Sequence, residues 1–154
     1  METVVKIEMT VCLYDGETND FRPFKEHESD AAYDLKSTEG YMLKPGERKV
    51  FSAGFRMELP SGYEAQIRPR SGNALKKGLS VLNSPGTIDS NYRGEVGVIL
   101  FNASQETIQI KRGDKIAQMV INKLPEVRLE FVHELNMETD RGENGFGSTG
   151  IAGN

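Results

Sequence analysis

The chain has 154 residues, of which 37% are hydrophobic and 27% are charged, and its net charge is −4 at pH 7. This composition is typical of a single globular domain, and the acidic balance argues against direct binding of nucleic acid. Because no apolar run reaches membrane-spanning length and the N-terminus lacks a signal-peptide pattern, we expect a cytoplasmic protein without a membrane segment. The single cysteine, Cys12, excludes an internal disulfide and agrees with a reducing compartment.

Alternation of apolar and polar residues predicts short, half-buried strands along most of the chain. The pattern occurs at residues 5–13, 55–59 and 63–68, and turn-forming sequences occur at 44–47, 60–62 and 112–114. Two nearly continuous apolar runs, at 96–101 and 116–121, are typical of strands covered on both faces. Many short strands at close spacing predict an all-β fold, a jelly-roll-like barrel.

Residues 71–78 break the strand pattern and predict one short helix. Ser71 is a candidate N-cap, lysines fall in the last turn, and Gly78 closes the segment. The start of this helix would present free N–H groups beside Arg68 and Arg70, which would suit an anion. An ordinary capped helix with surface arginines explains the same residues, and the sequence leaves both interpretations open.

Residues 86–95 predict a β-hairpin, with Asp89 just before the turn and Tyr92 just after it. An aspartate at such a position usually bonds to the backbone of its own turn. A functional role instead requires Asp89 to lie inside a pocket, with Tyr92 packed against a ligand. The residue types alone do not decide between the two roles.

The last stretch, residues 141–150, is too rich in glycine for a helix or a core strand. Its glycines let backbone N–H groups turn toward an anion, and Arg141 and Ser148 can donate hydrogen bonds to phosphate oxygens. Phe146 offers a flat face on which a base can stack. We therefore expect a domain at 1–136 and an arm at 137–154 that orders on a nucleotide, with a disordered terminus as the alternative.

Five segments together resemble, in the same order, the motifs of the homotrimeric dUTP pyrophosphatases (dUTPases). They are Ala31-Ala32-Tyr33-Asp34-Leu35, Pro69-Arg70-Ser71-Gly72-Asn73-Ala74, residues 86–95, Arg112-Gly113-Asp114-Lys115-Ile116-Ala117-Gln118 and residues 141–150. Single motifs of this kind are weak, whereas five in order over residues 31–150 are specific. Ala32 and Asn73 depart from common family residues without replacing a chemical group, and residues 15–28 have no clear counterpart.

The resemblance implies a homotrimeric jelly-roll-like barrel with active sites between subunits, where the arm of one subunit closes over a site formed by the other two. It implies Mg²⁺-dependent hydrolysis of dUTP to dUMP and pyrophosphate, which limits uracil incorporation into DNA and supplies dUMP for dTMP synthesis. In that reaction Asp89 would orient and deprotonate the attacking water and would contact the sugar 3′-hydroxyl.

The resemblance also implies how the triphosphate and its metal ion are held. The phosphate contacts would come from Arg70, Ser71 and Gly72 for the α- and β-phosphates, Gln118 for the phosphate chain, and Arg141, Gly147 and Ser148 for its far end. Mg²⁺ would be held mainly by phosphate oxygens and water, with Asp34 supporting it indirectly through water. A structural carboxylate that bonds local backbone is nearly as good an explanation of Asp34.

Selectivity for dUTP would come mainly from the predicted hairpin. Tyr92 would pack beneath the deoxyribose and leave no room for a 2′-hydroxyl, which rejects UTP. The remaining substrate contacts would be Asn83 and Gly97 near uracil, close backbone at Gly86 against the thymine methyl, the neighbouring Thr87 and Ile88, and Phe146 stacked on the base. A stacked aromatic contact is worth about 1–3 kcal/mol, and a mismatched base edge leaves buried polar groups unsatisfied.

Two other functions stay open at this point. A dCTP deaminase shares the fold and the triphosphate site, but it needs a glutamate at the base, where this chain has Asp89 and Tyr92. A regulatory binding protein could use nucleotide-dependent closure of the arm to engage a partner, and the polar residues 15–28 could contact that partner.

Overall fold

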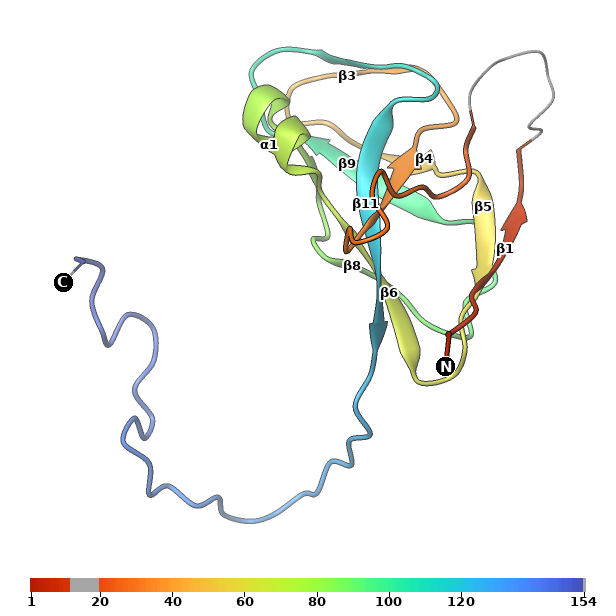
Figure 1. Ribbon diagram of the computed structural model, residues 1–154. Helices are drawn as coiled ribbons and strands as arrows, with labels where there is room; N and C mark the ends of the chain where they lie inside the picture. The colour runs from red at the N-terminus through yellow and green to blue at the C-terminus, as the bar shows by residue number, and fades with distance from the viewer. Residues whose placement is uncertain (12–19, 154) are drawn as a thin grey trace.

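The structure, a computed structural model, describes residues 1–11 and 20–153 (Figure 1). Within these residues the chain forms short strands and one helix, α1 (Ser71–Lys77). The strands are β1 (Lys6–Met9), β2 (Tyr33–Lys36), β3 (Tyr41–Leu43), β4 (Arg48–Ser52), β5 (Phe55–Glu58), β6 (Tyr63–Arg68), β7 (Leu79–Val81), β8 (Gly86–Ile88), β9 (Gly97–Asn102), β10 (Ile108–Ile110) and β11 (Lys115–Lys123). The predicted all-β class with one short helix is confirmed.

The strands pair in four antiparallel groups around one interior. The largest has the order β2-β11-β6-β8, and the others are β4-β9-β7, β1-β5 and β10-β3. Most neighbours in these groups are distant in sequence, which is typical of jelly-roll folds. The long strand β11 lies between β2 and β6, so it joins segments from the first and second quarters of the chain.

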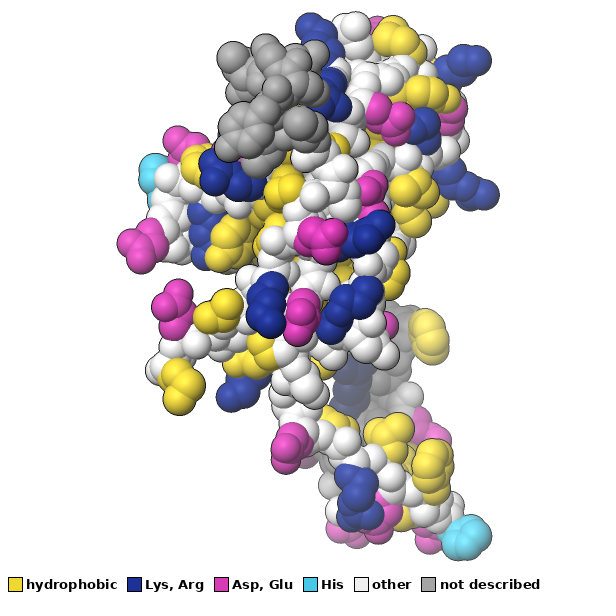
Figure 2. Space-filling view, turned by 90° about the vertical axis from the view of Figure 1, so that its right-hand side faces the viewer, with side chains coloured by type: hydrophobic (Ala, Val, Ile, Leu, Met, Phe, Trp, Pro, Cys, Tyr) yellow, Lys and Arg dark blue, Asp and Glu magenta, His cyan; other side chains and the backbone are white. Residues whose placement is uncertain are grey.

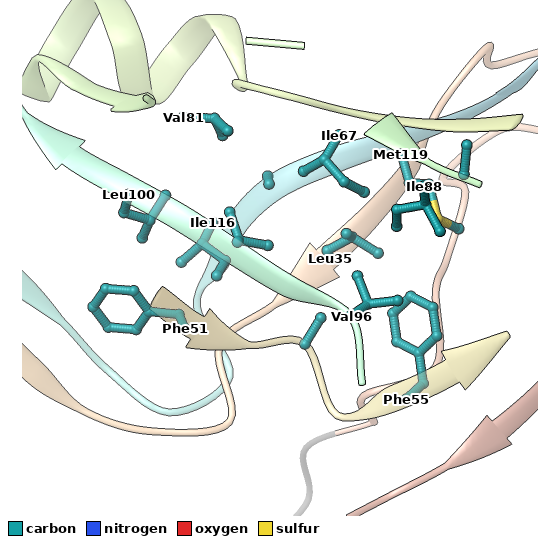
Figure 3. Close-up of a cluster of buried hydrophobic side chains, with 14 of the residues drawn as sticks. Leu35, Phe51, Phe55, Ile67, Val81, Ile88, Val96, Leu100, Ile116 and Met119 are labelled. Carbon is teal, nitrogen blue, oxygen red and sulfur yellow. The ribbon is translucent and has the colours of Figure 1, made fainter. Parts of the chain in front are cut away.

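One hydrophobic core binds these groups together (Figure 3). Phe51 of β4, Phe55 of β5 and Leu100 of β9 are fully buried, and they lie opposite Leu35 of β2 and Ile116 of β11. Burial of each such side chain stabilises the fold by roughly 1.5–3 kcal/mol. The core therefore holds the sheet that carries β11 against the sheet that carries β9.

The predicted alternation is confirmed in β5, where Phe55 and Met57 are buried and Arg56 and Glu58 are exposed. It is confirmed again in β6, where Ala65 and Ile67 are buried. β1 is different, because Ile7 remains 39% exposed although it belongs to an alternating run. Cys12, Leu13 and the first part of the unassigned 15–28 segment lie outside the described residues.

The hairpin predicted at 86–95 is wrong. β8 pairs with β6, whereas β9 pairs with β4 and β7, so the two strands belong to different sheets. Residues 89–96 form a turn and a crossing between these sheets instead. The error has a physical cause, since alternation identifies a strand but does not identify its hydrogen-bonding partner.

After Lys123 the chain leaves the body and runs away from it in extended form (Figure 1). Residues 124–153, called the arm from here on, contain turns and bends but no helix or strand. This segment begins before the arm of residues 137–154 that the sequence predicts. The large apolar side chains of this arm are exposed; they are Leu124, Val127, Leu129, Phe131, Val132, Leu135, Met137, Phe146 and Ile151. No helix in the described part of the chain combines the length and apolar character needed to cross a membrane.

Candidate functional site

The segment between β6 and α1 contains the residues predicted to hold phosphates. Ser71 is the first helical residue rather than the N-cap, which corrects the sequence interpretation: the N-cap is Arg70, in an extended conformation and without a side-chain capping bond. The first N–H bonded within the helix is that of Ala74, which donates to the Arg70 carbonyl at 3.0 Å. The N–H groups of Ser71 and Gly72 precede it, so they lie at the helix end that lacks internal acceptors.

Asp34 of β2 holds the side chain of Arg70. Arg70 Nε donates to Asp34 Oδ1 at 3.0 Å, and Lys115 Nζ lies 3.7 Å from Asp34 Oδ2. The Asp34 side chain is only 18% exposed, so these ion pairs are partly shielded from water. A partly buried pair resists salt and fixes geometry better than a surface pair does. Asp34 thereby sets the direction in which the guanidinium group points.

Gln118 fixes the same segment from the strand beside it. Its Nε2 donates to the Pro69 carbonyl at 2.9 Å. On β11, Gln118 pairs with Asp34 on one side and with Arg68 on the other. Three adjacent strands therefore present one row of polar side chains beneath the start of α1.

These groups line a pocket of about 480 Å³. The sequence-predicted residues that line it are Asp34, Arg70, Ser71, Gly72 and Gln118, together with Arg68. Arginine, hydroxyl and amide donors are the groups that bind phosphate oxygens. The pocket also has acidic walls at Glu26 and Asp30, whose carboxylates suit a hydrated cation better than a phosphate.

The turn that follows β8 has its own set of contacts. The Tyr92 N–H donates to the Asp89 carbonyl at 3.1 Å, and the Tyr92 hydroxyl donates to the Glu95 carbonyl at 3.0 Å. The Ser52 hydroxyl bonds to the Glu95 carboxylate, and this bond lowers the pKa of Glu95 below its ordinary value. Asp89 and Tyr92 are both exposed, so their side chains are accessible to a ligand.

The uracil contacts predicted around this turn are only partly accessible. Gly86 and Ile88 are buried, whereas Asn83, Thr87 and Gly97 are exposed. A Cβ atom at Gly97 would lie 2.9 Å from Val50 Cγ1, so a side chain there would have to displace the exposed Val50 side chain of β4.

In the described part of the chain, the predicted site residues Arg141 and Ser148 bond only to other arm residues. Arg141 Nε donates to the Asn144 carbonyl at 2.6 Å, and the Ser148 N–H donates to the Gly145 carbonyl at 3.1 Å. Gly147 adopts a positive φ of 86°, and Phe146 is fully exposed. The guanidinium, the hydroxyl and the ring therefore all stand in solvent.

A single copy of the chain brings only part of the predicted site together. Asp34, Arg70, Ser71, Gly72 and Gln118 share one pocket, and no residue of the 83–97 region or of the arm lines it. In Figure 1 the arm leaves the lower end of β11 and curves round beside the body, and its end lies apart from α1 and from the strands that carry this pocket.

The described residues contain no cluster of three or more His, Cys, Asp or Glu side chains arranged as a metal cage. Asp34 is already paired with two cationic side chains, Arg70 and Lys115, which offset its negative charge and make it a weaker direct ligand for a metal ion. The residues present therefore fit a cation that arrives with phosphate oxygens and water as its main ligands.

Sequence reasoning assigned no role to Lys115, Ser52 or Glu95. Lys115 lies inside the 112–118 motif, but strict alternation would have placed it on the face opposite Gln118, three residues further on. The structure instead has a register shift between Lys115 and Ala117, and Lys115 Nζ reaches Asp34. Ser52 and Glu95 have no such signal, because they are 43 residues apart and meet only through the crossing between the two sheets.

Comparison with known proteins agrees with these features. A family model described as dUTPase matches residues 22–150. A deoxyuridine 5′-triphosphate nucleotidohydrolase from Clostridium novyi (strain NT) is 57% identical over 129 residues, which cover 84% of this chain and 90% of the relative.

Two solved structures extend the comparison to the fold. A mutant dUTPase of Staphylococcus bacteriophage 80alpha with dUpNHpp is 27% identical, has a TM-score of 0.81, and covers 96% of this chain and 99% of its own. A mutant dUTPase from phage phi11 of S. aureus, described with a structural Mg(II) ion, is 26% identical, has a TM-score of 0.73, and covers 86% and 99%. Because the family model and the relative both extend over most of its length, the chain belongs to the dUTPase family.

Proposed function

We propose that the chain is a deoxyuridine 5′-triphosphate nucleotidohydrolase, which hydrolyses dUTP to dUMP and pyrophosphate. Family membership and the named relative at 57% identity support this function. Its role would be to keep uracil out of DNA and to supply dUMP for dTMP synthesis. The proposed location is the cytoplasm.

The structural observation that carries the proposal is that Arg70 is fixed in place at the edge of the pocket. Asp34 and Gln118 anchor the Pro69–Arg70 segment from two adjacent strands, so Arg70, Ser71 and Gly72 form a preset group of donors. Preset donors suit phosphoryl transfer, in which the protein contributes mainly positioning and charge stabilisation. We assign this group to the α- and β-phosphates.

We assign the general base to Asp89. Its carboxylate would take a proton from water as the water oxygen bonds to the α-phosphorus, and the bond to the bridging oxygen would break to release pyrophosphate. The exposed position of Asp89 allows this, since a base must lie within hydrogen-bond reach of the attacking water.

Mg²⁺ is the proposed cofactor, and the phi11 structure with a structural Mg(II) ion supports it by relationship. A bound Mg²⁺ neutralises phosphate charge and orients the leaving group. In this chain Asp34 would act on the ion through water while its carboxylate keeps Arg70 in place. Glu26 and Asp30 add negative charge to the same pocket.

We further propose that the chain works as a homotrimer, the assembly that the family resemblance implies. Association between copies is supported by two apolar surfaces that a single copy leaves uncovered. One surface is the arm, in which Val127, Leu129 and Phe131 alternate with charged residues in a strand-like pattern and are at least 72% exposed. The other is a groove of about 650 Å³ beside β1, here called the β1 groove. Its apolar lining includes Val4, Val5, Ile7, Met9, Tyr33, Tyr63, Met119 and Ile121.

A second copy of this chain fits both surfaces. β1 has β5 as its strand partner, so its other edge can accept an extended segment. Figure 2 shows hydrophobic side chains reaching the surface on the side that carries β1, and again along the projecting arm. Apolar patches of this kind mark interaction sites. Exchange of arms would place the glycine-rich end of one copy over a site on another.

Within that assembly, the arm would supply the lid. Arg141, Gly147 and Ser148 would reach the far phosphates, and Phe146 would cover uracil. The glycine content of the arm lets it order around a ligand.

Pyrophosphate release from dUTP, dCTP, dTTP and UTP with Mg²⁺ tests the proposed function. We expect cleavage of dUTP alone. Ammonia release from dCTP would indicate the deaminase instead. Nucleotide binding without cleavage would favour the regulatory binding protein.

A further inference from the structure

Tyr92 lies over the backbone of its own turn at a place where glycine is the only residue that fits. A Cβ atom built on Gly94 would lie 2.3 Å from Tyr92 Oη, 2.5 Å from Cζ and 2.9 Å from Cε2. Real Cβ atoms essentially never approach another heavy atom within 3.0 Å. A side chain at position 94 and the Tyr92 ring in its present place therefore exclude one another.

The constraint comes from the ring and not from the backbone. Gly94 does not have a positive φ, so its backbone conformation is open to alanine. The three atoms nearest to its Cβ all belong to the outer end of one side chain, which can rotate away. An alanine at this position therefore leaves the fold intact and displaces the ring.

The surrounding contacts hold the ring in that one place. The Tyr92 hydroxyl donates to the Glu95 carbonyl at 3.0 Å, which ties the ring to the far side of Gly94. Arg93 Nη1 donates to the Ser90 carbonyl at 2.7 Å and closes the turn. The Glu95 carboxylate bonds to Ser52, and the Val96 N–H donates to the Phe55 carbonyl at 2.9 Å, so the turn is attached to the β4–β5 corner.

We propose that Gly94 is a specificity-determining position: by leaving space for the Tyr92 ring, it sets where the ring meets the sugar of the nucleotide. This inference rests on the proposed function, in which Tyr92 rejects a 2′-hydroxyl. Restoring an ordinary contact distance would move the ring by about 1 Å. A shift of that size at a substrate-positioning group can change rates by as much as about 10²-fold.

Gly94→Ala tests the inference through discrimination between dUTP and UTP. We expect the ratio of the two kcat/KM values to fall about tenfold, with the thermal midpoint nearly unchanged. Gly40→Ala is the matched control, since its nearest contact would be an ordinary 3.5 Å and its φ is not positive. The control should leave the ratio as it is.

A double-mutant cycle separates the ring from any other effect of the alanine. In a Tyr92→Ala background there is no ring to displace, so Gly94→Ala should change the ratio by less than about twofold. If Gly94→Ala lowered the ratio of kcat/KM values equally in the Tyr92→Ala background, the inference would be overturned. An unchanged ratio in a folded Gly94→Ala variant would also overturn it.

The ring position can also be measured without catalysis. A crystal structure of Gly94→Ala should show the Tyr92 hydroxyl detached from the Glu95 carbonyl, and an intact 3.0 Å bond would overturn the inference. A wild-type chain that cleaves none of the four nucleotides would overturn the proposed function. An active wild type beside a fully selective Gly94→Ala variant would overturn only the role of Gly94.

Discussion

The Asp34 carboxylate accepts a hydrogen bond from Arg70 Nε at 3.0 Å, although the two residues are 36 positions apart in the chain. Asp34 lies on β2, and Arg70 precedes α1. The strand between β2 and β6 is β11, whose Gln118 bonds to the Pro69 carbonyl. Two adjacent strands, β2 and β11, therefore fix one arginine at the edge of the pocket, where it can meet an anion.

Asp34→Asn should lower kcat/KM for dUTP by roughly 10–100-fold, because the amide no longer neutralises and orients Arg70. Steady-state kinetics measures this loss. A titration with Mg²⁺ distinguishes the two roles of Asp34, since added Mg²⁺ restores activity only if the carboxylate acts mainly on the ion. Full recovery of the Asp34→Asn activity by added Mg²⁺ would contradict the proposal that Asp34 acts by positioning Arg70.

Asp20→Asn is the control for this variant. Asp20 pairs with Arg22 at 2.6 Å, but both side chains are at least half exposed, at 50% and 67%. Exposed pairs contribute little, so activity and stability should stay near the wild-type values.

Asp89→Asn should reduce kcat by about 10²–10⁴-fold while a non-hydrolysable dUTP analogue still binds. Asparagine keeps the shape and the turn-forming ability of aspartate but is a poor base. Single-turnover kinetics and calorimetric binding measure the two effects separately. Turnover at the wild-type rate would mean that Asp89 only stabilises its backbone turn and is not the general base.

Asp114→Asn is the matched control for Asp89→Asn. The Asp114 carboxylate accepts a hydrogen bond from the Lys111 N–H at 2.8 Å, so it is a turn aspartate with a local partner. Its substitution should leave kcat near the wild-type value.

Two truncations separate the lid from the assembly. A chain that ends at Met137 lacks Arg141, Phe146 and Ser148 but keeps the apolar part of the arm, so it should stay assembled and lose most of its hydrolysis. A chain that ends at Lys123 lacks the whole arm and should also dissociate.

Light scattering and pyrophosphate release measure both properties for each truncated chain, and thermal unfolding checks that the body stays folded. Full activity of the chain that ends at Met137 would contradict the proposal that the arm acts as a lid. A trimer formed by the chain that ends at Lys123 would contradict the proposal that the subunits assemble by exchanging arms.

Stability should fall in acid partly through Glu95. The hydrogen bond from Ser52 holds the pKa of Glu95 in the folded chain below its ordinary value of 4.5. The bond therefore contributes fully above pH 4.5, and its contribution is lost as the pH falls through the folded pKa. Glu95→Gln should weaken the dependence of the thermal midpoint on pH below that value.

Ser52→Ala removes the first cause of the same pKa shift and should weaken the pH dependence in the same direction. Thermal unfolding at a series of pH values measures all three chains. Identical slopes for the wild type and both variants would show that the bond does not contribute to acid stability.

The local features of this chain could be predicted from its residues alone. Alternation identified β5 and β6 because side chains along a strand point to opposite faces, whatever the partner strand is. The helix at Ser71–Lys77 and the glycine-rich arm were also recognisable, since helix formers and glycine act over a few residues. The pocket residues Arg70, Ser71, Gly72 and Gln118 were assigned through the family resemblance, although the helix start beside Arg70 also suggested an anion site.

What the residues alone did not determine is which distant segments meet. The sequence suggested that β8 and β9 pair as a hairpin, but the core places them in different sheets. Asp34 meets Lys115 and Arg70 only because β2, β11 and β6 are neighbours in one sheet, and Gly94 matters only because the Tyr92 ring lies across it. These contacts depend on the packing of the whole core, because strand pairing and close side-chain contact are set by long-range burial rather than by local preference.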